Sequence, residues 1–205
     1  MTSSELSALL VLATVSSFTP GPNTTLSTAM AANHGLRRAM RFVCAVPVGW
    51  GILFVLCATG LGGLVVAFPP LRWGIVVLGT GYLLWLASRL WGSHSLQQAD
   101  SAKLQVGFVQ GVGLQFLNIK AWMLALAIVA GWVAGRDDAS ARTLMLLPIM
   151  VAYGFVSNLA YAVAGSVLRH WLAHGRRLLM FNRCMSVALL ATVLWMLIGL
   201  RQSAT

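Results

Sequence analysis

The chain has 205 residues, of which 59% are hydrophobic and only 9% are charged, and its mean hydropathy is +0.82. Because a soluble domain carries about 25% charged residues, this composition excludes a water-soluble protein and indicates an integral membrane protein. The 14 Lys and Arg against 4 Asp and Glu give a formal charge of +10. These basic residues lie in short clusters between apolar stretches, so we expect the lipid bilayer as a partner and no nucleic acid.

The sequence contains no pattern typical of a catalytic or metal site. No connecting segment exceeds about 15 residues, so no catalytic domain fits outside the bilayer. Cys44, Cys57 and Cys184 lie in apolar stretches without the spacing of metal ligands, and we expect no metal, no cofactor and no disulfide. The segment from Met1 to Glu5 lacks the basic region of a signal peptide, which predicts a retained first helix.

Six apolar stretches follow one another along the chain, at roughly 5–34, 39–67, 71–91, 105–135, 143–168 and 178–200. A bilayer core of about 30 Å takes roughly 20 helical residues, a length that fits the second, third, fifth and sixth stretches. The first and fourth have about 30 residues each, and as continuous helices they would be about 45 Å long. Each of these two long stretches is interrupted near its middle.

The first interruption is the run from Thr19 to Asn23, in which Pro20 and Pro22 lack N–H groups and Gly21 permits unusual backbone angles. The second is the run 115–120, which reads QFLNIK. A helix broken at membrane depth leaves polar backbone groups that lipid cannot satisfy, so such breaks line a cavity or are packed in protein. Breaks at corresponding places in two halves are typical of the binding site of a transporter.

The two halves of the chain share further features. Pro47 and Pro148 each fall early in the helix that follows a break, and Leu-Trp pairs recur at 84–85 and 194–195. Three helices per half is an odd number, so a repeat places the halves in opposite orientations. We therefore expect an all-α transmembrane domain over residues 1–205. Its six transmembrane helices form two inverted three-helix repeats (about 1–92 and 104–205), with helices 1 and 4 broken near mid-membrane.

The basic residues of the short loops predict the orientation. One side of the membrane receives nine of them: Arg37, Arg38, Arg41, Arg89, Lys103, Arg169, Arg176, Arg177 and Arg183. The other side receives four: Arg72, Arg136, Arg142 and Arg201. The side with nine is expected to be cytoplasmic, which places both termini outside.

Three segments resemble the lysine exporter (LysE/RhtB) family of small amino-acid exporters. They are Phe18–Asn23, reading FTPGPN; Gly81–Leu86, reading GYLLWL; and Phe108–Trp122, reading FVQGVGLQFLNIKAW. They lie in the order expected of the family across nearly the whole chain. One residue departs from the family pattern, because Ile119 stands where the family normally has proline. We therefore expect a milder second break, with a kink in place of an unwound turn.

The resemblance implies a multi-pass protein of the bacterial inner membrane that exports amino acids or related metabolites from the cytoplasm in exchange for protons. A neutral substrate is favoured, because no acid within the spans can hold a second ammonium group. The alternative on the same fold is export of a metal ion or another small solute, which the lack of ligand spacing disfavours. An enzyme would need a catalytic motif, and a non-transporting assembly factor would not explain two breaks.

The first break offers partners for both charges of an amino-acid zwitterion. Carbonyls freed at Ser16 and Phe18 suit an ammonium group, and the N–H groups that open the next helix near Asn23 suit a carboxylate. The alternative is a packed proline kink with Asn23 as its N-cap. Together with the resemblance, this chemistry predicts four substrate-binding residues at the first break: Pro20, Gly21, Pro22 and Asn23.

Lys120 lies deep in the fourth stretch, where a charged lysine costs roughly 2.5–3.5 kcal/mol on insertion scales. All four acids lie at or beyond the ends of the spans, so this lysine has no evident carboxylate partner. We expect it to pair with freed carbonyls, to lose its proton or to meet the carboxylate of the substrate. The alternative is a lysine that snorkels to a nearby interface. With Asn118, it forms the predicted site at the second break.

Asn158 and Tyr161 share one face of the fifth stretch with Gly154 and Gly165. This face indicates either close helix packing, which small residues and cross-helix hydrogen bonds favour, or the lining of a cavity. Asn158 and Tyr161 complete the set of candidate substrate-binding residues, and Gln110 and Gln115 are candidates for the same polar interior. GxxxG pairs at 107/111 and 131/135 permit close packing within one chain or in a homo-oligomer.

Overall fold

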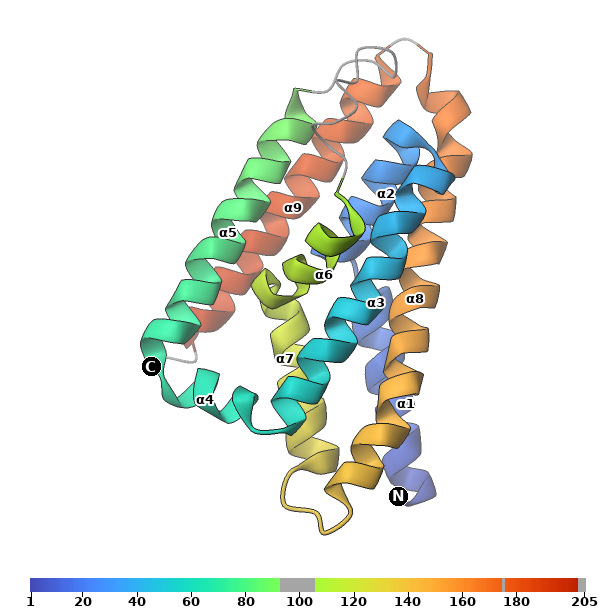
Figure 1. Ribbon diagram of the computed structural model, residues 1–205. Helices are drawn as coiled ribbons and strands as arrows, with labels where there is room; N and C mark the ends of the chain where they lie inside the picture. The colour runs from blue at the N-terminus through green and yellow to red at the C-terminus, as the bar shows by residue number, and fades with distance from the viewer. Residues whose placement is uncertain (93–105, 175, 203–205) are drawn as a thin grey trace.

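The computed structural model describes residues 1–92, 106–174 and 176–202, and within these ranges the regular elements are all helices (Figure 1). The expected all-α class is therefore confirmed. The elements, in chain order, are α1 (Ser3–Phe18), α2 (Pro22–His34), α3 (Leu36–Ala58), α4 (Leu61–Ala67), α5 (Pro69–Trp91), α6 (Phe108–Leu117), α7 (Ile119–Ile128), the π-helical turn η1 (Val129–Val133), α8 (Ala139–Leu172) and α9 (Arg177–Gln202).

The first break lies between α1 and α2, where the prolines predict it. Helix α1 starts from a capping box, in which the side chains of Thr2 and Glu5 each accept the other's backbone N–H at 3.2 and 2.8 Å. It ends at Phe18, and α2 begins with Pro22. At the first position of a helix the missing N–H of proline costs nothing, and its fixed φ suits a helix start.

The second break is a single extended residue, Asn118, with φ −90° and ψ 101°. The helices on either side of it meet at 68°. The second break is therefore a kink at one residue without an unwound turn, as expected, although the bend is sharp. Without a proline at position 119, Asn118 itself starts the next helix. Its Oδ1 accepts the backbone N–H of Lys120 at 3.1 Å and so starts α7 as an N-cap.

The second predicted span, 39–67, is too long. It divides at Thr59 and Gly60 into α3 and the short α4. Gly60 has a φ of 109°, in the left-handed region that favours glycine. Helix α8, by contrast, continues over 34 residues through Pro148, as α3 continues through Pro47. One proline inside a packed helix therefore does not break it, whereas two prolines around a glycine do.

Four of the described helices have the length and composition to cross a membrane, namely α3, α5, α8 and α9. A fifth span results if the bent pair around Asn118 counts as one. Helix α1 is apolar but has only 16 residues. Helix α2 has 13 residues, and several of them are polar. The first predicted span thus consists of two helices that are each too short to cross alone.

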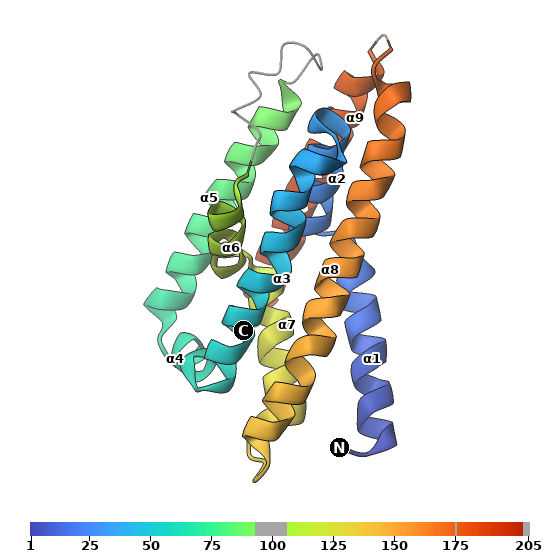
Figure 2. The same cartoon turned by 45° about the vertical axis from the view of Figure 1, so that its right-hand side comes forward.

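Helix α2 is the central helix of the bundle. Every residue from Thr24 to His34 is buried, because α2 is packed against α8, α3 and α9. Helix α1, in contrast, lies at the edge of the bundle beside the lower part of α8 (Figure 2), and its Val11 and Val15 are exposed. Since its neighbours shield it on all sides, α2 tolerates polar residues that a lipid-facing helix would not.

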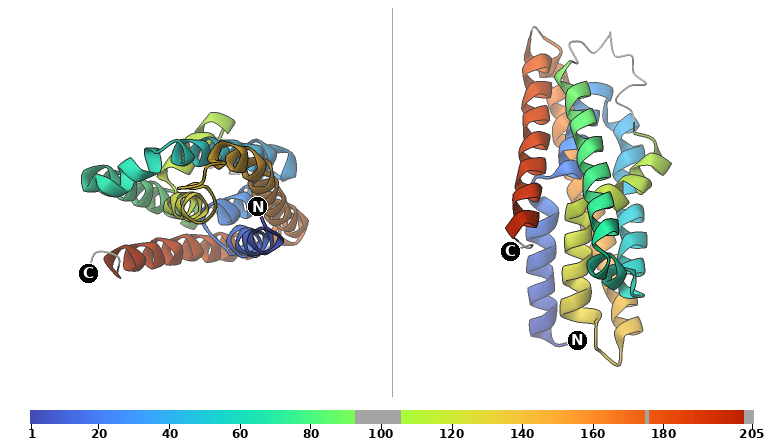
Figure 3. Two further views of the ribbon diagram at one scale, coloured as in Figure 1. Left: turned by 90° about the horizontal axis from the view of Figure 1, so that it is seen from below. Right: turned by 90° about the vertical axis from the view of Figure 1, so that its left-hand side faces the viewer.

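Corresponding helices of the two halves run in opposite directions. In Figure 1, α3 descends and α8 ascends, while α5 ascends and α9 descends. Helix α3 packs against α8, and α5 packs against α9 at one edge of the bundle (Figure 3).

The basic residues are grouped by helix end. The end of α5, the end of α8 and the starts of α3 and α9 lie together at one end of the bundle, and they carry Arg37, Arg38, Arg41, Arg89, Arg169, Arg176, Arg177 and Arg183. The starts of α5 and α8 lie at the other end, with Arg72, Arg136 and Arg142. Lys103 lies outside the described residues.

Two glycines allow helices to approach to backbone contact. A Cβ at Gly165 in α8 would collide with the carbonyl of Thr28 in α2. A Cβ at Gly79 in α5 would collide with the carbonyl of Leu117 beside the second break. Gly81, two residues further along α5, has open space around it. Gly79 thus sets how closely α5 supports the second break.

Gly79→Ala is expected to destabilise the protein, because the added methyl group must push α5 away from the Leu117 carbonyl. Overpacking of this kind costs about 1–3 kcal/mol. Gly81→Ala is the matched control on the same helix and should be neutral or slightly stabilising, since Ala is about 1 kcal/mol better than Gly in a helix. Thermal unfolding in detergent, followed by tryptophan fluorescence, checks both variants. Equal melting temperatures for the two would contradict the close contact.

Candidate functional site

The two breaks meet inside the bundle around a cavity of about 70 Å³. Since a cavity needs roughly 10–15 Å³ to hold one water, this space takes about five waters or a small solute. Its lining comes from α1, α2, α3, α7, α8 and both breaks, and it comprises Ser16, Ser17, Thr19, Gly21, Pro22, Asn23, Thr24, Val46, Pro47, Trp50, Asn118, Lys120, Ala121, Leu124, Met150, Gly154, Ser157 and Asn158.

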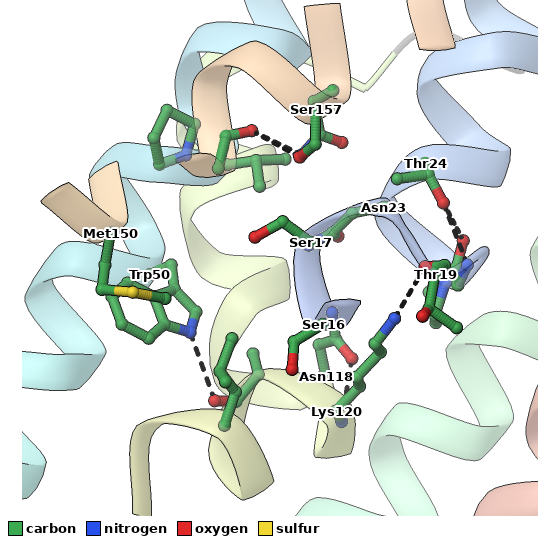
Figure 4. A pocket seen from close by; sticks show the side chains of 18 residues that line it. Ser16, Ser17, Thr19, Asn23, Thr24, Trp50, Asn118, Lys120, Met150 and Ser157 are labelled. Atoms are coloured by element: carbon green, nitrogen blue, oxygen red, sulfur yellow. Dashed lines mark hydrogen bonds between the residues drawn. The ribbon is translucent and has the colours of Figure 1, made fainter. Parts of the chain in front are cut away.

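The cavity has a polar and an apolar side. Figure 4 shows Trp50 and Met150 on one side and Lys120 with Thr19 on the other, with Ser16 and Ser17 between them. The Trp50 ring stacks on Phe54 with centroids 5.3 Å apart, and its Nε1 donates to the Ala121 carbonyl at 3.3 Å. These two contacts hold the apolar wall in place.

Side chains of the second half satisfy carbonyls freed at the first break. A continuous helix would pair the carbonyls of Phe18 and Thr19 with N–H groups four residues further along the chain, but Pro22 has none. The Tyr161 hydroxyl from α8 donates to the Phe18 carbonyl at 2.9 Å instead. Lys120 Nζ from α7 donates to the Thr19 carbonyl at 2.8 Å. Of the partners expected for Lys120, a freed carbonyl is the one present.

Two more carbonyls lose their helical donors at this break. The donor for Ser16 would be Pro20, which has no N–H. The donor for Ser17 would be the Gly21 N–H, which donates to Thr24 Oγ1 at 2.9 Å. Both serines line the cavity. The Phe18 carbonyl was expected to be free for the substrate, but it accepts a hydrogen bond from Tyr161. The Ser17 carbonyl, which was not among the expected acceptors, loses its helical donor instead.

Helix α2 begins at the cavity with N–H groups that no side chain caps. Its N-cap, Gly21, has no side chain, and its first residue, Pro22, has no N–H. The Thr25 N–H is used, since it donates to the Gly21 carbonyl at 2.9 Å. Among the residues that the structure describes, the N–H groups of Asn23 and Thr24 have no acceptor. They lie at the positive end of the α2 dipole, where an anion is favoured.

Lys120 is the one ionisable side chain in the cavity lining. It lies directly beside the first break, because a Cβ on Gly21 would be 3.2 Å from both its Cδ and its Nζ. The glycine therefore leaves the space that the lysine side chain uses. The structure therefore does not support the alternative in which Lys120 snorkels to a nearby interface.

The acids of the described chain stand far from this lysine, at the end of the bundle where α1 and α8 begin. Glu5 pairs with Arg136 at 3.3 Å and with Arg142 at 3.5 Å, and Asp138 pairs with Arg142 at 2.7 Å. The hydrogen bond from Arg142 holds the pKa of Asp138 below its ordinary value, so this carboxylate stays charged. The fourth acid, Asp100, lies outside the described residues.

The structure brings six of the eight predicted site residues into the lining: Gly21, Pro22, Asn23, Asn118, Lys120 and Asn158. Pro20 is exposed outside it, and Tyr161 reaches the break only through its bond to Phe18. The role of these residues in binding remains a prediction. The apolar wall around Trp50 and Met150 was not predicted, because in a membrane protein such side chains look like any lipid-facing residue.

Asn158 has both roles that the sequence left open. Its Oδ1 accepts the Ser27 hydroxyl at 3.0 Å and its Nδ2 donates to the Gly154 carbonyl at 2.8 Å, so it joins α8 to α2. It also lines the cavity. Gln110, by contrast, is exposed and accepts the Gly107 N–H at 3.0 Å, so it is not part of the polar interior.

Comparison with known proteins identifies the family of this chain. A family model described as LysE type translocator matches residues 14–199. A cysteine/O-acetylserine efflux protein of Klebsiella pneumoniae subsp. pneumoniae is 30% identical over 179 residues, which cover 87% of this chain and 91% of the relative. Proteins of the same name from Salmonella typhimurium and Escherichia coli K12 are 28% and 27% identical over the same shares. No solved structure matches the chain.

The family match begins within α1 and ends within α9, so it contains both breaks and every residue of the cavity lining. It confirms the family predicted from three short segments, and with it the predicted export activity. The chain belongs to the LysE type translocator family, and it is a multi-pass amino-acid exporter of the bacterial inner membrane, not an enzyme.

Proposed function

We propose that this exporter carries small neutral amino acids out of the cytoplasm and exchanges them for protons at the cavity between the two breaks. The observation that carries the proposal is the lining itself. It combines freed carbonyls, uncapped N–H groups and one lysine with an apolar wall, and it contains no carboxylate. Such a lining matches both charges of a zwitterion and leaves an uncharged surface for the side chain.

The two charges of the substrate have separate partners in this proposal. The carboxylate binds the N–H groups of Asn23 and Thr24 at the start of α2, where the helix dipole favours an anion. The ammonium group binds the carbonyls of Ser16 and Ser17 at the negative end of α1. A zwitterion of this kind bridges the break and replaces hydrogen bonds that the backbone lost there.

The apolar wall and the volume favour a small, uncharged side chain. Val46, Trp50, Leu124 and Met150 offer no partner to a second charge, and burying an unpaired ion costs several kcal/mol. The cavity of about 70 Å³ suits a solute of few non-hydrogen atoms. The names of the relatives, cysteine/O-acetylserine efflux proteins, support the same substrate class, and cysteine and O-acetylserine are the substrates that we propose to test first.

Proton exchange is proposed to follow from repulsion between two cations at the first break. Without substrate, Lys120 Nζ binds the Thr19 carbonyl at 2.8 Å. A substrate ammonium arriving from the cytoplasm brings a second cation into one small cavity, where like charges repel strongly. Lys120 therefore releases its proton to the cytoplasm as substrate binds, and it takes up a proton from outside after substrate leaves. One proton enters for each substrate exported.

We also propose the predicted membrane topology. Helices α1 and α2 together form the first span, and α6 with α7 forms the fourth, which gives six spans in inverted halves of about 1–92 and 104–205. The opposite directions of α3 and α8, and of α5 and α9, support this arrangement. The end of the bundle that carries most arginines would face the cytoplasm, and both termini would be outside.

Lys120→Gln is expected to abolish stimulation by a pH gradient but to retain exchange of labelled for unlabelled substrate, because an amide cannot carry the proton. Lys120→Arg is the matched variant, since a guanidinium keeps its charge at every working pH. It should hold the break and slow both modes of transport. Counterflow of cysteine in proteoliposomes, with and without a pH gradient, separates the two. Equal stimulation of Lys120→Gln and wild type would remove the proton role from this lysine.

In the same assay, unlabelled cysteine, O-acetylserine and serine are expected to drive counterflow. Lysine and glutamate should do so at least about tenfold more slowly, because the cost of an unpaired buried charge exceeds the 1.4 kcal/mol that corresponds to tenfold. Rates for each amino acid at equal concentration give the comparison. Faster exchange of lysine than of cysteine would contradict the neutral substrate class.

The proposed orientation is tested with a reporter fused after Thr205. A periplasmic reporter such as alkaline phosphatase should be active there, and the same reporter inserted after Arg37 should be inactive. The reason is that short loops rich in Arg and Lys are retained in the cytoplasm. Activity in the reverse pattern would overturn the orientation but not the transport mechanism.

A further inference from the structure

A pair of amide side chains joins the two breaks behind the cavity. Asn23 Nδ2 donates to Gln115 Oε1 at 2.8 Å, and Gln115 Nε2 donates to Asn23 Oδ1 at 3.3 Å. Asn23 is in the first turn of α2, and Gln115 is in the last turn of α6, three residues before Asn118. Each break therefore has one side chain that holds the other break.

The geometry around Gln115 shows that it is a fixed residue and not a ligand. It is fully buried, with 0% of its surface exposed, and it does not line the cavity. Its Nε2 also donates to the Gly111 carbonyl at 3.1 Å. A Cβ on Gly49 of α3 would lie 2.8 Å from its Cγ, so α3 presses directly against this side chain. Gln115 has no space in which to swing toward a substrate.

The same pair changes the role of Asn23. Its side-chain oxygen and nitrogen are both bonded to Gln115, whereas its backbone N–H has no acceptor among the described residues. The side chain of Asn23 is bonded to Gln115 at the second break, and Asn23 also lines the cavity. The position of Asn23, and with it that of the first N–H groups of α2, therefore depends on where α6 holds Gln115.

We infer that Gln115 is a positioning residue for export: through Asn23 it holds the start of α2 in register with the second break. The uncapped N–H groups of α2 and Nζ of Lys120 then face one cavity. The inference rests on the proposed function, because it assigns the pair to the site where the substrate binds. When the two halves rearrange during transport, the pair makes the two breaks move together.

The pair depends on the combined length of the two side chains. Asn is one methylene shorter than Gln, so Asn23→Gln makes the link too long and Gln115→Asn makes it too short. Either change leaves buried amide groups without partners, which is costly where no water can replace them. Making both changes at once restores one Asn and one Gln facing each other, and therefore restores the combined length.

The test is a swap of the two amides, measured by cysteine counterflow in proteoliposomes. The variants are Asn23→Gln, Gln115→Asn and the double swap. Gln110→Asn is the control, because it makes the same chemical change on the same helix at an exposed position. Each single change should lower kcat about tenfold, as expected for the loss of a buried hydrogen bond. KM should rise together with the fall in kcat, because the N–H groups of α2 that bind the substrate carboxylate are displaced. The double swap should recover most of kcat, and the control should resemble wild type.

Several results would overturn the inference. A double swap as slow as the slower single variant would show that the two amides do not act as a pair. A rise in KM without a fall in kcat would make Gln115 a substrate ligand. Melting temperatures that fall equally in the single variants and the double swap would leave it only a structural role. If wild type exchanges no neutral amino acid, the proposed function fails instead, and the swap is measured with the substrate that the panel identifies.

Discussion

Backbone groups released inside an apolar bundle must find partners other than water, and this requirement organises the protein. The prolines at the first break free carbonyls that Tyr161 and Lys120 then bind from the second half of the chain. At the second break, Asn118 binds the N–H that starts α7. The first break thus depends on side chains from the other half, which is why the two breaks come together at one cavity.

Close helix contacts make this arrangement possible. Gly165 allows α8 to touch the backbone of α2, and Gly79 allows α5 to touch the chain just before Asn118. Small residues permit such approach where apolar association gives no driving force in lipid. As a result α2 is buried in protein from Thr24 to His34, and its polar residues in this range do not face lipid.

The site consists of what these contacts leave unpaired. At the first break Tyr161 and Lys120 bind two of the four freed carbonyls. Within the described part of the chain, the N–H groups of Asn23 and Thr24 and the carbonyls of Ser16 and Ser17 are left without partners on the two sides of this short break. In the proposed mechanism these groups bind the two charges of a free amino acid, and Lys120 beside them carries the exchanged proton. The amide pair of Asn23 and Gln115 keeps this arrangement in place from behind.

The sequence by itself determined the membrane class, the all-helical fold, the first break and the family, because these follow from composition, from the missing N–H of proline and from short motifs. Only the tertiary structure decided that Asn118 bends the chain by 68° without a proline, that Tyr161 occupies the Phe18 carbonyl, and that Gln115 holds Asn23. Each of these outcomes depends on which side chain, often a hundred residues away in the chain, arrives within about 3 Å of a freed group. Local sequence patterns do not contain that information, since hydrogen bonds across a bundle are set by the packing of whole helices.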